Sequence, residues 1–510
     1  MRKSGILMPV FSIPSKYGIG TMGKEAYQFI DFLEASKQSY WQILPLGQTS
    51  YGDSPYQSFS TFACNPYFID LEQLVELGLL TIEECEREDA TVCLESVDYE
   101  KIYHTRYQLL RLAYSRAEYS QEKSYQRFMK KNKKWIEDYA LFMAIKDEQG
   151  GCSWQQWPQA LRLRNAAILE TKRHTLRTNI QFYYFTQYIF DQQWNKLRAY
   201  ANKKGIQIIG DIPIYVAEDS ADAWKNPELF QFDENLNPTL VAGCPPDCFS
   251  PTGQLWGNPL YNWQKHQETG YQWWMDRMEQ CGNLCDIVRI DHFRGFDEYY
   301  AIPATDETAE NGTWEQGPGI GLFEAMAPVM EKLEIIAEDL GFITESVVEL
   351  VKKTGFPNMK ILQCGFDPYA DSEFLPHNYH KNTVVYTGTH DNETIVGWYR
   401  NQDEQTKEFV QAYLDLSVDH VRKRVAEEEI AWKLIRLAMM SPADICIIPM
   451  QDYLLLDNTA RINQPSTLGM NWKWRMKKDA ITPQLVEKIA DLVKISARNN
   501  VTLDIAINKV

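Results

Sequence analysis

Eight short runs of apolar residues, spread along the chain and mostly ending in polar residues, constrain the fold most strongly. Most runs are continuous rather than alternating, which is typical of strands buried on both faces of a parallel sheet. The runs are GILMPV (5–10), YWQILPL (40–46), IQIIGDIPIYV (206–216), CDIVRID (285–291), EIIAED (334–339), MKILQCGF (359–366), TVVYTGTHD (383–391) and ICIIPMQD (445–452). Helical patterns separate several of them, for example at 273–281 and 343–355. This alternation predicts an α/β protein with a (β/α)8 barrel (TIM barrel), whose active site lies at the carboxyl ends of the strands.

Two interruptions in the spacing of the strands predict insertions into one catalytic barrel that spans residues 1–510. Residues 70–180 carry helical periodicity but no comparable apolar run, which predicts an inserted helical subdomain between the second and third strands. A helix over 182–205 then leads back into the barrel. Residues 219–275 are rich in Pro, Gly, Asn and Trp, which predicts a second insertion that serves as a substrate lid or binding loop.

The charge and apolar content of the chain exclude several classes of partner. The formal net charge of −17 argues against nucleic acid and against an anionic membrane surface, because both attract clusters of Lys and Arg. The first apolar run meets Pro9 and Pro14 too early for a signal-peptide core. No uninterrupted apolar stretch approaches the ~20 residues that span a bilayer. We therefore expect a cytoplasmic protein, and the charge does not argue against a neutral substrate such as a glucan.

The aromatic residues allow two interpretations. The chain has 15 Trp and 28 Tyr, which suits either a surface that stacks on sugar rings or a large aromatic core. The run FMKKNKKW (128–135) is basic and aromatic, a pattern typical of one solvated helix face.

Ten cysteines include two closely spaced pairs, Cys244 with Cys248 and Cys281 with Cys285. Such spacing could hold zinc or form disulfides. Cys285 lies within the apolar run LCDIVRI, however, where a thiol acts as a small hydrophobic group. A reducing cytoplasm also disfavours disulfides. We therefore expect no metal site and no disulfide.

Two carboxylates stand at the ends of neighbouring predicted strands, as retaining glycoside chemistry requires. Asp291 follows Arg289 by two residues on the same strand face, so the cation can keep the carboxylate ionised as a nucleophile. Glu338 ends the next strand, and its neighbour Asp339 points to the opposite side. Glu338 is therefore the better proton donor, with a pKa that we expect a nearby like charge to raise. A single strand-end carboxylate could equally be a helix cap or a surface ion-pair partner.

Other polar residues at strand ends fit the grip on a distorted sugar ring. Asp391 and His390 close the run TGTHD, and a carboxylate with an imidazole can bind ring hydroxyls more tightly as the ring distorts. His390 could instead be a satisfied core histidine. Asp211 ends the third strand, where it can be a hydroxyl ligand or a hydrogen-bond acceptor at the barrel mouth.

Six long strings resemble one known family. They are LPLGQTSYGDSPYQSFSTFACNP (44–66), GDIPIYV (210–216), PPDCFSPTGQLWGNPLYNW (245–263), VRIDHFRGF (288–296), AEDLG (337–341) and TGTHDN (387–392). In this order they resemble 4-α-glucanotransferases (amylomaltases or disproportionating enzymes, glycoside hydrolase family 77), from about residue 5 to about residue 475. Cys64, Cys244, Cys248, Gln464 and Ser466 depart from the family's usual residues, which bears on the lid and on acceptor preference.

The resemblance implies the role of each acid. It makes Asp291 the nucleophile, Glu338 the acid/base and Asp391 the stabiliser of the transition state. It further implies substrate contacts from Arg289, His292, His390, Asp211, Tyr56, Trp256 and Asn463.

The predicted reaction is the retaining transfer of α-1,4-glucan segments from a donor to an acceptor maltooligosaccharide or glucose, through a covalent glycosyl-enzyme. It needs no cofactor and no metal, because the two carboxyl groups supply the nucleophile and the proton. Two alternatives are an α-amylase-like hydrolase with the same acids and a non-catalytic glucan-binding protein on a barrel scaffold.

Overall fold

Eight parallel strands form the centre of the molecule, and the computed structural model describes residues 2–246, 250–416 and 426–499. The strands are β1 (Lys3–Leu7), β2 (Tyr40–Gln42), β3 (Gln207–Pro213), β6 (Ile287–Asp291), β9 (Glu334–Ala337), β10 (Asn358–Ile361), β11 (Thr383–Tyr386) and β12 (Ile445–Pro449). Each falls within one of the eight predicted runs or within two residues of it. Their order in the sheet is β10-β11-β12-β1-β2-β3-β6-β9.

The sheet closes into a barrel between β9 and β10. The amide of Ala337 donates a 3.0 Å hydrogen bond to the carbonyl of Pro357, next to the start of β10. One buried cluster takes a side chain from every strand and fills the interior: Leu7, Tyr40, Ile209, Ile287, Ile336, Met359, Ile361, Val384, Tyr386 and Ile447. These β-branched and aromatic residues fill the tapered interior, so the barrel is a packed core. The predicted (β/α)8 barrel is confirmed.

Helices surround the strands, and neighbouring helices such as α1 with α9 and α17 with α19 pack against each other. They are α1 (Lys24–Ala35), α9 (Arg177–Lys203), α12 (Gln272–Leu284), α13 (Ile320–Met330), α14 (Glu345–Thr354), α15 (Ile395–Asn401), α16 (Glu404–Tyr413), α17 (Glu427–Met440), α18 (Met450–Tyr453) and α19 (Pro483–Ile495). No helix in the described ranges is long and apolar enough to cross a membrane.

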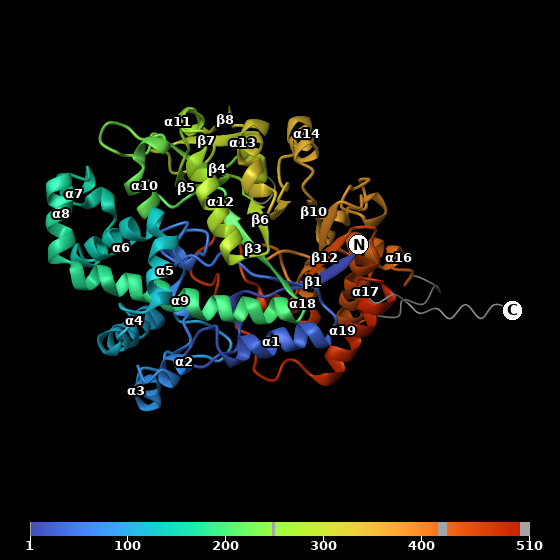
Figure 1. Cartoon of the computed structure of the whole chain (residues 1–510). Helices are drawn as coiled ribbons and strands as arrows, with labels where there is room; N and C mark the ends of the chain where they lie inside the picture. The colour runs from blue at the N-terminus through green and yellow to red at the C-terminus, as the bar shows by residue number, and fades with distance from the viewer. Residues whose placement is uncertain (1, 247–249, 417–425, 500–510) are drawn as a thin grey trace.

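The chain between β2 and β3 is helical, as the periodicity of residues 70–180 predicts. Its helices are α2 (Leu71–Glu76), α3 (Ile82–Arg87), α4 (Tyr99–Arg116), α5 (Lys123–Lys131), α6 (Lys133–Glu148), α7 (Gln159–Arg162) and α8 (Ala166–Thr175). In Figure 1 they gather on one side of the barrel, and the long helix α9 runs from them back to it. Helix α9 starts five residues before the predicted 182 and stops just before Gly205, whose φ is 76°. The boundary of a separate subdomain here stays a prediction.

A second, antiparallel sheet stands above the barrel in Figure 1, with the order β5-β4-β7-β8. Strands β4 (Leu240–Cys244) and β5 (Gln254–Pro259) come from the predicted insertion 219–275, together with helices α10 (Ala221–Lys225) and α11 (Trp263–Glu268). Strands β7 (Glu298–Pro303) and β8 (Thr313–Gln316) follow β6 and are absent from the sequence prediction. Two separate segments of the chain, one before β6 and one after it, therefore form this antiparallel sheet.

Candidate active site

The alternation of side chains along three neighbouring strands brings the predicted acids to one end of the barrel. Ile209 of β3, Ile287 of β6 and Ile336 of β9 point into the barrel interior. Side chains repeat with a period of two along a strand, so Asp211, Arg289 and Glu338 continue the same inward-facing rows. Asp211 lies directly opposite Arg289 in the β3–β6 register, and Asp291 is two residues further on. The predicted strand-end clustering is therefore confirmed.

Arg289 joins two of these carboxylates through a single nitrogen. Its Nη1 lies 2.8 and 2.7 Å from the two oxygens of Asp211 and 2.9 Å from Oδ1 of Asp291. The side chains of Asp211 and Arg289 are 0% and 3% exposed, whereas that of Asp291 is 26% exposed. Burial raises the pKa of Asp291, and the adjacent guanidinium opposes that rise. Asp291 is thus an oriented carboxylate with an open side, as a nucleophile needs.

Glu338 is held by backbone amides, whereas Asp291 is held by a guanidinium. Its Oε2 accepts a 2.5 Å hydrogen bond from the backbone N–H of His292, and its Oε1 accepts a 2.9 Å bond from the amide of Leu340. Burial raises the pKa of Glu338 to about 8, while Arg289 lowers it and Asp291 raises it further. The predicted rise is present, but burial rather than the like charge is its main cause. Glu338 therefore holds a proton near neutral pH.

Asp339 faces away from this site, as predicted. Its Oδ1 accepts a 2.9 Å hydrogen bond from the amide of Met359 at the start of β10. Asp339 therefore helps to join β9 to β10, and Glu338 alone of this pair faces the site that contains Asp291.

A hydrogen-bonded chain continues from Asp211 to the third acid. The hydroxyl of Tyr56 donates to Oδ2 of Asp211 at 2.8 Å and lies 2.9 Å from Nε2 of His390. The same Nε2 is 3.2 Å from Oδ2 of Asp391, and Nδ2 of Asn463 donates to Oδ1 of Asp391 at 2.6 Å. The Tyr56 and His390 rings stack with centroids 5.3 Å apart. The three loops that follow β2, β11 and β12 therefore meet here.

The protonation of His390 follows from these contacts. Burial and the nearby Arg289 lower the pKa of His390 to about 3, so its ring is neutral. The Tyr56 hydroxyl donates its hydrogen bond to Asp211, and the carboxylate of Asp391 can only accept. Nε2 of His390, which lies between Tyr56 and Asp391, must therefore carry the hydrogen. Nε2–H then donates to Tyr56 and Asp391 together. His390 is therefore hydrogen-bonded within the cluster of predicted site residues, between Tyr56 and Asp391.

His292, directly after barrel strand β6, and Trp256, from the second sheet, complete the set. His292 has φ 52°, a left-handed conformation that turns the chain directly after Asp291, and its amide donates to Glu338. Its ring meets Trp256 of β5 edge-on, with centroids 4.9 Å apart. Burial lowers the pKa of His292 to about 3. Trp256, which belongs to the insertion 219–275, thus contacts the residue that directly follows Asp291.

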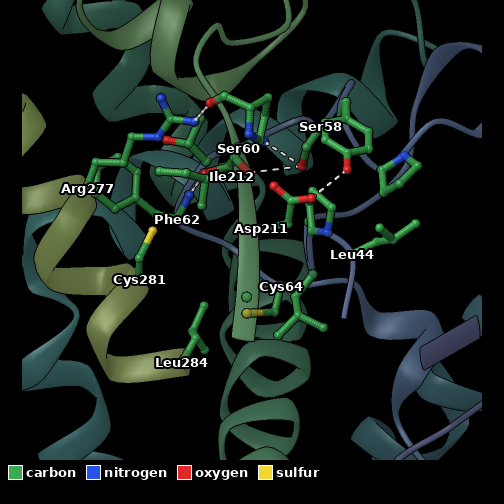
Figure 2. Close-up of a pocket in the computed structure, with 18 of the residues that line it drawn as sticks. Leu44, Ser58, Ser60, Phe62, Cys64, Asp211, Ile212, Arg277, Cys281 and Leu284 are labelled. Atoms are coloured by element: carbon green, nitrogen blue, oxygen red, sulfur yellow. Dashed lines mark hydrogen bonds between the residues drawn. The ribbon is translucent and has the colours of Figure 1, made fainter. Parts of the chain in front are cut away.

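A small cavity of about 60 Å³ lies beside Asp211 and includes Leu44, Phe62, Cys64 and Cys281 in its lining (Figure 2). Cys64 and Cys281 are buried thiols whose pKa burial raises. Cys281 and Cys285 are both free and buried, and both line this cavity. Cys248 lies outside the described residues. The described residues contain no group of three or more His, Cys, Asp or Glu side chains that could hold a metal ion.

Arg461 and Asp452 contact the chain around Asp391, and neither is among the site residues predicted from the sequence. Arg461 donates to the carbonyl of Asp391 at 2.6 Å and to that of Asn463 at 2.7 Å, so it fixes both ends of their contact. It lies in a loop without any strand pattern, so no signal marks it. Asp452 accepts from Thr387 at 2.5 Å and from the amide of Ile395 at 2.8 Å. It closes the last predicted run, so the strand-end criterion that selects Asp291 would have selected it too.

A family profile matches residues 8–482 of this chain, and its description is 4-alpha-glucanotransferase. The chain belongs to the 4-alpha-glucanotransferase family. It is 50% identical over 505 residues to the 4-alpha-glucanotransferase of Streptococcus pneumoniae, covering 98% of each chain. It is 47% identical to that of Clostridium butyricum, covering 96% of this chain and 100% of the relative.

Solved structures agree with the family assignment. The amylomaltase of Streptococcus agalactiae, solved in complex with acarbose, superposes with a TM-score of 0.93 at 40% identity, covering 98% of this chain and 100% of that one. Amylomaltase from Corynebacterium glutamicum shares the fold at 18% identity, with a TM-score of 0.79 over 98% of this chain and 75% of that one. This chain is therefore a glycosyl-transferring enzyme that moves α-1,4-glucan segments.

Proposed function

We propose that Asp291 is the nucleophile of a retaining transfer. Its open side leaves room for attack on the anomeric carbon, while Arg289 holds the other side of the carboxylate in place. Attack forms an ester between Asp291 and the donor sugar and breaks the bond to the departing oxygen. When Asp291 becomes an ester, Arg289 still has a carboxylate partner, because it also binds the buried Asp211.

Glu338 supplies the proton to the departing oxygen in this first step. Its buried carboxyl is protonated near neutral pH, with two backbone amides that fix its orientation. In the second step the resulting carboxylate removes the proton from the 4-hydroxyl of the acceptor, whose oxygen attacks the anomeric carbon and breaks its bond to the Asp291 carboxylate. Asp291 is released, and an α-1,4 link forms with net retention.

Asp391 and His390 form hydrogen bonds with the hydroxyls of the distorted donor sugar ring in both steps. Asn463 and Arg461 hold Asp391 by its carboxylate and its carbonyl, so its 38% exposed side chain meets the sugar in a fixed position. Hydrogen bonds from such fixed groups strengthen as the ring flattens towards the oxocarbenium-like transition state. Tyr56 and Asp211 support His390 from behind.

We take the donors and acceptors to be maltooligosaccharides and glucose. Transfer requires that acceptor sugar, and not water, reaches the ester. The stretch 245–263 is suited to exclude water, because its Trp256 lies against His292 beside Glu338. We further propose the two insertions, 70–180 and 219–275, as subdomains of the barrel and the cytoplasm as the compartment. Buried thiols such as Cys281 and Cys285 support the latter.

The observation that carries this assignment is the contrast between the two acids. Asp291 contacts a guanidinium at 2.9 Å, whereas Glu338 is held by two backbone amides and has its pKa raised to about 8. Environments that separate two carboxyl groups in this way assign the nucleophile and the acid.

Incubation with maltotriose tests the proposal. Wild-type protein should yield glucose and longer oligomers, and Asp291→Asn and Glu338→Gln should each lose at least about 10³-fold in rate. Asp339→Asn is the matched control, because the neighbouring acid faces away, and it should retain activity within a few-fold. Wild-type-like transfer by Asp291→Asn would refute the assignment. Mainly maltose and glucose from the wild type would instead indicate hydrolysis.

A further inference from the structure

A second cavity, of about 250 Å³, lies between helices α6, α10 and the start of α12. Its aromatic lining consists of Phe62, Trp135, Tyr139 and Trp273. Phe62 and Trp135 lie nearly parallel, with ring centroids 6.4 Å apart and an interplanar angle of 18°, while Trp273 meets Phe62 edge-on at 6.1 Å. Trp135 is half-buried, whereas the other three rings are buried. The cavity therefore has a flat apolar wall that is partly open to solvent.

Hydrogen-bonding side chains lie around this wall. Nζ of Lys134 lies 2.6 Å from Oδ1 of Asp276, so this ion pair spans the cavity from α6 to α12. Nε2 of Gln272 donates to the same oxygen at 2.9 Å. Lys225 of α10 pairs with Asp138 of α6 at 3.0 Å. Each of the two lysines is therefore already paired with a carboxylate. The ammonium, amide and carboxylate groups lie within hydrogen-bonding distance of one another.

The balance of charge determines which ligands the cavity can take. Four carboxylates, those of Asp138, Asp222, Glu228 and Asp276, line it against two lysines. A phosphate or other anion would meet a net negative lining and two paired cations, so its binding is unfavourable. A neutral polyol can bridge the same carboxylate and ammonium groups while its ring stacks on an aromatic wall.

The size of the cavity suits one end of such a ligand. About 250 Å³ is just below the roughly 300 Å³ at which pockets for drug-sized ligands begin, so a terminal sugar unit fits better than a chain segment. Phe62 and Ser60 separate this cavity from the smaller one beside Asp211, because both residues line both cavities. None of the three acids of the active site lines it.

We propose that this cavity is a second α-glucan site, distinct from the catalytic one, that binds the terminal glucose unit of a maltooligosaccharide against Trp135. The glucan as ligand follows from the family's activity on α-1,4-glucans, and the sugar class follows from the aromatic wall and neutral pairing. The basic and aromatic run 128–135 thereby has a role beyond a solvated helix face, because Lys134 and Trp135 belong to it.

Calorimetric titration with maltotriose tests the site in the full-length Asp291→Asn protein, which binds sugar without consuming it. We expect two classes of site, with the second weakened at least tenfold by adding Trp135→Leu. Tyr369→Leu, which changes an aromatic residue that is 78% exposed and outside the cavity, should leave both classes unchanged. The paired change Gln272→Ala with Asp276→Ala acts on the rim rather than on the core, and should also weaken the second class.

Thermal unfolding and binding at the first class show whether each variant remains folded. A single class of site in Asp291→Asn that Trp135→Leu does not weaken, or a second class that Trp135→Leu and the rim variant both leave intact, would overturn the proposal. Tighter binding of glucose 1-phosphate than of glucose at the second class would overturn it too, because the cavity would then be an anion site. A single class of site that Trp135→Leu does weaken would instead count against the proposed active site.

Discussion

The backbone N–H of His292 donates a 2.5 Å hydrogen bond to Oε2 of Glu338. This bond joins the residue directly after the proposed nucleophile to the proposed acid/base. The left-handed φ of 52° at His292 then turns the chain away directly after that amide. The Glu338 carboxyl is therefore anchored to the backbone next to Asp291, while the Asp291 carboxylate itself is held by Arg289.

The pH dependence of the reaction should have its alkaline limb at the pKa of Glu338. Because burial raises that pKa to about 8, we expect kcat/KM for maltotriose to fall roughly tenfold per pH unit above pH 8 as the acid loses its proton. A glycosyl fluoride donor, whose leaving group needs no proton, should lack this limb in its donor-cleavage step. An identical alkaline limb for both donors would assign the titration to another group.

Replacement of Arg289 by lysine should damage the nucleophile in particular. A lysine side chain is shorter and more flexible than that of arginine, so its ammonium does not hold the position from which Nη1 of Arg289 contacts Asp211 and Asp291 together. We expect kcat/KM to fall by at least about 10²-fold and the acidic limb of the pH profile to move to higher pH, because Asp291 loses the cation that opposes its raised pKa. An acidic limb at its wild-type position would contradict this.

Asn463 should contribute by holding Asp391. Asn463→Leu removes a 2.6 Å hydrogen bond to a carboxylate, an interaction that contributes about 1.5–3 kcal/mol, so kcat should fall by roughly 10- to 150-fold. Gln464→Ala changes the exposed neighbouring side chain and should leave kcat within a factor of about two. Equal effects from the two changes would mean that the loop, and not the contact, is what matters.

Asp452 should make stability depend on pH. Burial raises its pKa to about 7, so folding favours its neutral form, and its stabilising contribution is lost as pH rises from about 4 through 7. Asp452→Asn removes this loss and should raise the melting temperature relative to wild type more at pH 8 than at pH 5, through a difference of about 3 kcal/mol between the two pH values. Asp457→Asn is the control, because the pKa of Asp457 is lowered by Thr459 and Arg400. A gain that is the same at both pH values would contradict this assignment.

The barrel and the position of its acids could be predicted from the sequence because both depend on local patterns. Ile209 and Asp211, or Ile336 and Glu338, are two residues apart, so burying the apolar residue of each pair in the barrel fixes where the carboxylate points. Strands β7 and β8 could not be predicted in the same way. Leu240 pairs with Pro303 across more than 60 residues of chain, and no local pattern contains that partner.

The electrostatic causes were also beyond the sequence. Whether Glu338 owes its raised pKa to Asp291 or to burial depends on how completely the second sheet and the loop after β6 cover it. Arg461 shows a further limit, because its role rests on two backbone carbonyls, at Asp391 and Asn463, that any residues could supply.

Trapping the covalent intermediate tests the central assignment most directly. In Glu338→Gln, an α-maltotriosyl fluoride donor should still react with the nucleophile, because fluoride leaves unaided, but the ester should persist for lack of a base. Mass spectrometry of the digested protein should find the added maltotriosyl group on the peptide that contains Asp291, and on no peptide when Asp291→Asn is added. A maltotriosyl group on another residue, or the absence of any adduct while fluoride is released and transfer products form, would contradict the account.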